Sequence, residues 1–167
     1  GAATLHMPRA IWVTANPGAG RDTFVKLCAR FLRACGAISR EEVVWVEGPD
    51  LASGDPAELI AKSLASADRG CIAVRDADTL ADAREALRAL AGSLGGTEGG
   101  GTTLAVVLGS PSGMARISRI EPSLDSRFPT RVVIPDFKAT ELVDFIERAA
   151  ANLPSGALEL EEGLAPR

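Results

Sequence analysis

The chain has little of what metal centres, disulfide scaffolds and membrane spans are built from. Its 167 residues include one histidine and three cysteines, and the cysteines show no metal-ligand spacing. An odd number of cysteines without such spacing favours a reduced, intracellular chain over a disulfide-bonded one. The apolar runs are short beside the roughly 20 residues that a membrane-spanning helix needs. We therefore expect a cytoplasmic protein with no membrane span.

An excess of positive charge is also absent. The formal net charge is -4, which argues against a nucleic-acid partner for the domain as a whole. The composition is otherwise ordinary for a globular protein, with 46% hydrophobic and 24% charged residues. The length allows one domain with a substantial core and is too short for two comfortable ones.

The two ends of the chain differ in character from its middle. Residues 1–7 are interpreted as a remnant of cloning, so His6 is not expected to have a function. Residues 153–167 begin with a helix-breaking Pro/Gly stretch and continue with an acidic run, which predicts an acidic linker or tail. The domain is therefore expected to span residues 8–152, cut from a longer protein.

Between these ends, short apolar runs alternate with helical patterns. Five runs are rich in strand-forming residues: 10–14, 43–46, 71–74, 104–108 and 131–134. Strands that alternate with helices are typical of a parallel sheet covered on both faces. The pattern therefore predicts an α/β fold, a three-layer sandwich around a five-stranded parallel sheet.

Three of the helical patterns make specific predictions. The helix after the first strand has an apolar stripe at three- and four-residue steps, and the stripe is expected to face the core: Phe24, Leu27, Cys28, Phe31 and Cys35. One continuous helix is predicted over 79–94 and another over 140–151. Asp55 and Pro56 are typical of a helix start, as N-cap and first helical residue.

The segment between the first strand and the first helix lies where a phosphate-binding loop occurs. Such a loop has a glycine, four residues, then Gly-Lys and Ser or Thr, because glycine lets backbone N–H groups approach phosphates and the hydroxyl holds magnesium. In this chain Ala15, Arg21 and Asp22 stand at the first glycine, the lysine and the hydroxyl positions. Taken alone, these departures favour a plain glycine-rich turn. The candidate loop comprises Asn16, Pro17, Gly18, Ala19, Gly20, Arg21 and Asp22.

Other segments of the sequence favour a phosphate-binding loop over a plain glycine-rich turn. Residues 16–20 and the amphipathic helix after them, together with residues 70–77, 104–111, 121–129 and 132–137, resemble the AAA+ ATPases of the CbxX/CfqX group. These are relatives of red-type rubisco activase and of a type VII secretion ATPase. The segments occur in the family's order over roughly residues 10–152. The resemblance implies the P-loop NTPase sandwich of an AAA+ large domain, here without the helical lid domain.

The resemblance also shows where the catalytic residues have changed. At the two acidic positions of the Walker B motif stand Arg75 and Asp76, and an arginine cannot ligate magnesium. The polar residue of the sensor-1 position is either Ser110 or absent. Near the arginine-finger position Asp125 replaces the first of two arginines, and only Arg127 remains. The resemblance therefore implies that Asp76, Ser110 and Arg127 are vestigial.

Two of these changes have opposite charges. In the resembled fold the positions of Asp22 and Arg75 both point at the same magnesium ion. We therefore expect an ion pair between them in the metal position, with no metal bound. The alternative is that two positions drifted independently into exposed residues.

These observations predict a non-hydrolysing pseudo-ATPase, a structural or protein-interaction module with no cofactor. Its expected partners are other domains of the same protein or a protein partner, in a homo- or hetero-oligomer, with no nucleic acid. The alternative is an ATP-binding AAA+ domain with slow or partner-assisted hydrolysis, which would take ATP or ADP with magnesium. A small-molecule-binding α/β domain unrelated to nucleotides is a third interpretation.

Overall fold

The computed structural model describes residues 9–94, 102–138, 140–144 and 148. The expected cloning remnant and the acidic tail lie outside these residues. Contacts divide the chain into two units, Gly1–Pro135 and Asp136–Arg167. In the second unit residues 140–144 are helical and Leu142 is 45% exposed, while half of the helix predicted over 140–151 lies outside the described residues.

The first unit is built on a parallel sheet, as predicted. Its five strands are β1 (Ala10–Ala15), β2 (Val43–Glu47), β3 (Cys71–Arg75), β4 (Leu104–Gly109) and β5 (Thr130–Ile134). Their order across the sheet is β2-β3-β4-β1-β5, and every pairing is parallel. All carboxyl ends of the strands therefore lie at one edge, where loops can bring side chains together.

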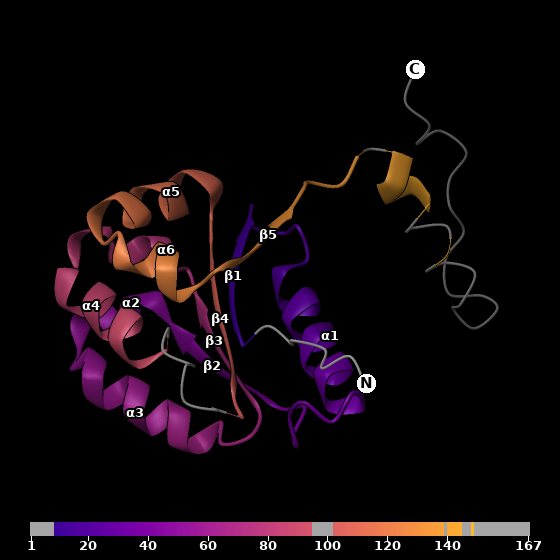
Figure 1. The fold of residues 1–167 in the computed structure, drawn as a ribbon. Coiled ribbons are helices and arrows are strands. Elements are labelled where there is room, and N and C mark those ends of the chain that lie inside the picture. Colours follow the sequence, from indigo (N-terminus) through magenta and orange to yellow (C-terminus); the bar gives the residue numbers. More distant parts are fainter. Residues whose placement is uncertain (1–8, 95–101, 139, 145–147, 149–167) are drawn as a thin grey trace. The chain divides into compact units, whose positions relative to one another are not determined.

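Helices cover the two faces of the sheet unequally (Figure 1). One face has α1 (Arg21–Ala34) alone. The other has α2 (Gly48–Ser53), α3 (Pro56–Ser66), the 3₁₀ helix η1 (Ala77–Asp82), α4 (Arg84–Ser93), α5 (Pro111–Ile120) and α6 (Ser123–Arg127). Each face has its own hydrophobic core. The result is an α/β architecture of three layers.

The stripe predicted as the buried side of α1 is wrong. The helix buries Val25, Ala29 and Leu32 against the sheet, while Leu27 is 54% exposed and Phe31 62% exposed. Cys35 is exposed as well, and only Phe24 and Cys28 of the predicted stripe pack partly against the core. The apolar pattern of α1 is thus wider than the contact that α1 makes.

The helix predicted over 79–94 is interrupted. Asp76 has a left-handed backbone with a φ of 47°, and the Thr79 hydroxyl donates to the Asp76 carbonyl at 2.7 Å. This tight turn starts η1 in place of an α-helix. Ala83 then leaves helical geometry, with φ -110° and ψ 70°, before α4 begins. The apolar stripe survives the break, because Leu80 and Leu87 are both fully buried.

The predicted start of α3 is confirmed. The Asp55 side chain accepts hydrogen bonds from the backbone N–H groups of Ala57 and Glu58, both at 3.0 Å, and Pro56 is the first helical residue. Among the described residues, no helix combines the length and the apolar character that crossing a membrane requires.

Candidate functional site

The loop after β1 makes a sharp turn at the carboxyl edge of the sheet. Gly18 and Gly20 have φ values of 86° and 85°, a left-handed conformation that side chains disfavour. The Ala19 N–H donates to the Asn16 carbonyl at 3.2 Å. Gly20 directly precedes α1, so the turn delivers the next two residues, Arg21 and Asp22, into the first turn of that helix.

The ion pair expected between Asp22 and Arg75 is present. An oxygen of the Asp22 carboxylate lies 3.1 Å from an Nη atom of Arg75. The contact joins the first turn of α1 to the last residue of β3. Both side chains are half-buried, with 46% and 33% of their surfaces exposed.

A second ion pair stands beside the first, and sequence reasoning missed it. An Nη atom of Arg21 lies 3.2 Å from the Asp76 carboxylate. Two consecutive residues of α1 thus bind two consecutive residues at the end of β3 in reversed order: Arg21 binds Asp76, and Asp22 binds Arg75. The signal was in the sequence, because four of the altered motif positions are charged and their charges match in pairs. We call these two contacts the crossed ion pairs.

Arg75 is the centre of a larger cluster. Its guanidinium also lies 3.3 Å from the carboxylate of Glu47, the residue directly opposite it on β2. The guanidinium carbon stacks over the Trp45 ring, 3.9 Å from the ring centre, a favourable cation–π geometry. Arg75 therefore contacts two acids and an aromatic ring at once. Its Nε atom is buried and has no hydrogen-bond partner among the described residues.

Ser110, the candidate sensor-1 residue, is engaged in local structure. Its hydroxyl donates to the Asp78 carboxylate at 2.6 Å and accepts from the Gly113 backbone N–H at 3.3 Å. The second contact makes Ser110 the N-cap of α5. Asp78 presses so closely on α5 that a Cβ at Gly113 would lie 2.1 Å from the Asp78 Cβ. Ser110 therefore has a clear structural role.

Arg127 is not brought to this site. It is exposed and ends α6, three residues before β5 begins at Thr130. Thr130 is level with Ile11 near the start of β1, whereas the candidate loop follows the end of β1 at Ala15. Arg127 thus lies toward the opposite edge of the sheet.

The candidate site does not fit a magnesium ion. Asp22, Glu47 and Asp76 surround two guanidiniums, those of Arg21 and Arg75. A guanidinium has donors only and cannot ligate a cation. Within the part of the chain that the structure describes, no three His, Cys, Asp or Glu side chains are arranged to hold a metal.

Comparison with known proteins adds no family. No protein-family model matches this chain, and a search of curated proteins found no match.

Proposed function

We propose that this chain is a degenerate AAA+-like module that does not hydrolyse nucleotide and acts as a structural or protein-interaction domain. The proposal depends above all on the crossed ion pairs. The four charged residues at the altered Walker positions form two ion pairs, where a working site would hold phosphate and metal.

The chemistry of phosphoryl transfer supports the proposal. That reaction depends on positioning and on neutralising the charge of the transferred phosphoryl group. Asp22 sets a carboxylate in the first turn of α1, where the outer phosphates would lie. Arg75 sets a positive charge where the metal would lie. Binding Mg-ATP in the usual way would require separating both ion pairs and placing like charges together.

Calorimetric titration with ATP and ADP, with and without magnesium, tests the proposal most directly. We expect no heat of binding, and no thermal shift with millimolar Mg-ATP. A ligand present at a concentration equal to its dissociation constant stabilises a protein by only about 0.4 kcal/mol. Even a millimolar affinity for Mg-ATP would therefore raise the melting temperature only slightly. Binding in the micromolar range would contradict a vestigial loop and favour an ATP-binding domain.

Hydrolysis is tested separately with a restored site. The matched variant has four substitutions: Arg21→Lys, Asp22→Thr, Arg75→Asp and Asp76→Glu. We expect the natural chain to show no turnover, and the variant to gain magnesium-dependent nucleotide binding. Turnover by the natural chain that Asp76→Ala abolishes would overturn the proposal, because it would assign Asp76 a working catalytic role.

A further inference from the structure

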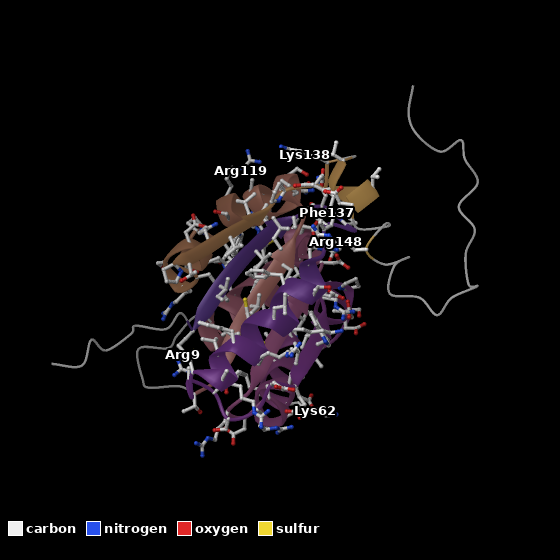
Figure 2. All side chains as sticks on the ribbon, turned by 90° about the vertical axis from the view of Figure 1, so that its right-hand side faces the viewer. Arg9, Lys62, Arg119, Phe137, Lys138 and Arg148 are labelled. Atoms are coloured by element: carbon white, nitrogen blue, oxygen red, sulfur yellow. The ribbon has the colours of Figure 1, made fainter. Side chains whose placement is uncertain are left out.

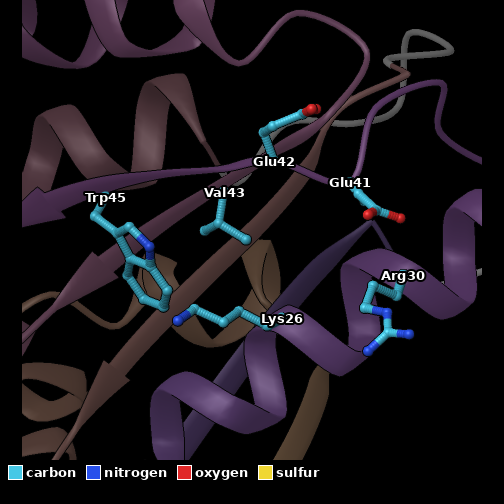
Figure 3. A pocket seen from close by; sticks show the side chains of 6 residues that line it. All are labelled: Lys26, Arg30, Glu41, Glu42, Val43 and Trp45. Atoms are coloured by element: carbon cyan, nitrogen blue, oxygen red, sulfur yellow. The ribbon is translucent and has the colours of Figure 1, made fainter.

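A groove runs between α1 and the edge strand β2, on the face of the sheet that α1 covers alone (Figure 3). Its volume is about 450 Å³. Six residues line it: Lys26, Arg30, Glu41, Glu42, Val43 and Trp45. Lys26 points across the groove toward the Trp45 ring. None of the six lining residues belongs to the crossed ion pairs, although Lys26 lies one turn after Asp22 on α1 and Trp45 contacts Arg75.

The charges of the groove do not cancel. Glu41 lies 3.2 Å from Arg33, and Glu42 lies 3.6 Å from Arg40, so each acid has its own cation. Lys26 and Arg30 make no ion pair or hydrogen bond through their side chains with any described residue. The surface that remains to be neutralised is therefore positive, although the chain as a whole has a net charge of -4.

The groove also has apolar surface to bury. Val43 and Trp45 are only partly buried, because α1 covers the middle of the sheet and leaves the β2 edge open. One face of the Trp45 ring is covered by Arg75 at 3.9 Å. The apolar surface of the groove is therefore that of Val43 and the open side of Trp45.

We infer that this groove docks an acidic amphipathic helix of a partner protein. Lys26 and Arg30 are four residues apart on α1, which sets them about 6 Å apart along one side of the helix. Carboxylates at the same spacing on a partner helix would match them, and apolar side chains beside those carboxylates would cover Val43 and Trp45. The inference deepens the proposed interaction role by naming the partner's chemistry, and it does not depend on the state of the nucleotide site.

A synthetic amphipathic peptide of leucine and glutamate, fluorescently labelled, is the probe. We expect saturable binding by anisotropy that weakens as salt rises. The double variant Lys26→Glu/Arg30→Glu should lose at least tenfold in affinity. The matched control is Lys62→Glu/Arg84→Glu, which makes the same charge change on α3 and α4. Neither residue lines the groove, and both lie on helices that cover the other face of the sheet (Lys62 is labelled in Figure 2), so the control should bind as the natural chain does.

The outcomes separate this inference from the proposed function. Absence of saturable binding would overturn the groove assignment, and so would equal binding of a leucine–lysine peptide or an equal loss in the control variant. Circular dichroism of both variants keeps a folding defect from being read as a binding defect. If neither the peptide nor Mg-ATP binds, the groove assignment is wrong and the pseudo-ATPase proposal stands. If the peptide binds and the chain hydrolyses ATP, the groove assignment stands and the pseudo-ATPase proposal is wrong.

Discussion

The two faces of the sheet differ in how completely helices cover their apolar side chains. The face under α2 to α6 has 22 buried hydrophobic residues among those described, including Trp12 and Phe128 with ring centres 6.2 Å apart. The α1 face has 11, and it leaves Val43, Trp45, Val132 and Ile134 only partly covered at its two sides. One face is closed and contributes stability. The other is held by a single helix and keeps apolar surface within reach of a partner.

The largest expected difference in stability comes from truncating one leucine of α4 and one leucine of α1. Leu87 belongs to α4 and is fully buried, whereas Leu27 belongs to α1 and is 54% exposed. Leu87→Ala should lower the free energy of unfolding by about 2–5 kcal/mol, because it leaves a cavity. Leu27→Ala should change it by less than about 0.5 kcal/mol. Urea denaturation of both variants measures the difference. Equal losses would mean that Leu27 packs as tightly as Leu87 and that the outer side of α1 is not open.

A second test measures how tightly the closed face is packed around Asp78. Gly113→Ala would set a Cβ 2.1 Å from the Asp78 Cβ. We expect a loss of about 1–3 kcal/mol in unfolding free energy, because neither backbone can move aside without disturbing the cap of α5. Gly92→Ala, where a Cβ meets nothing within 4 Å, is the control. It should stabilise α4 by up to about 1 kcal/mol. A neutral Gly113→Ala would show that the contact is loose.

The crossed ion pairs lie at the margin of the α1 face, and a double-mutant cycle weighs them. Asp22→Ala, Arg75→Ala and the double variant should give a coupling energy of about 0.5–1 kcal/mol, since both side chains are partly exposed and screened by water. The exposed pair Arg33 and Glu41 is the control, with an expected coupling below about 0.5 kcal/mol. Chemical denaturation at low and high salt measures both cycles. A coupling near zero for Asp22 and Arg75 would remove their structural role.

The smallest expected effect is a difference in thiol reactivity with no change in stability. Burial, with a smaller contribution from nearby Cys28, raises the pKa of Cys71 to about 12. Its thiolate is therefore scarce at pH 8, whereas Cys35 is exposed. In a thiol-reagent assay Cys35 should react first, and Cys71 only once the protein is unfolded. Cys35→Ser should remove the fast phase. Rapid labelling of Cys71 in the folded protein would mean that the α1 layer opens readily.

Much of the fold could be predicted because strands and caps are encoded locally. The five β-rich runs became five strands, and Asp55 caps α3 as expected. The orientation of α1 could not be read from its pattern, because Val25, Ala29 and Leu32 form a second apolar stripe beside the predicted one. Which of the two stripes packs against the strands is decided by the tertiary structure and not by the local pattern.

The candidate site could also be predicted only in part. The contact between Asp22 and Arg75 followed from the resemblance and from matching charges. The roles of Glu47 and Trp45 could not be read from the motifs, because they depend on the register that sets Glu47 opposite Arg75. The interruption of the helix predicted over 79–94 could not be foreseen either, because it involves a left-handed backbone at Asp76, which a non-glycine residue rarely adopts, and a non-helical backbone at Ala83.

The crossed ion pairs also bear on the evolutionary history open to this site. Arg75→Asp alone would set a fourth carboxylate among Asp22, Glu47 and Asp76, and Asp22→Thr alone would deprive Arg75 of one of its two acids. Each single step toward a metal-binding loop thus unbalances the cluster before any metal can compensate. The charges of the cluster therefore favour the residues now present over either single substitution toward a metal site.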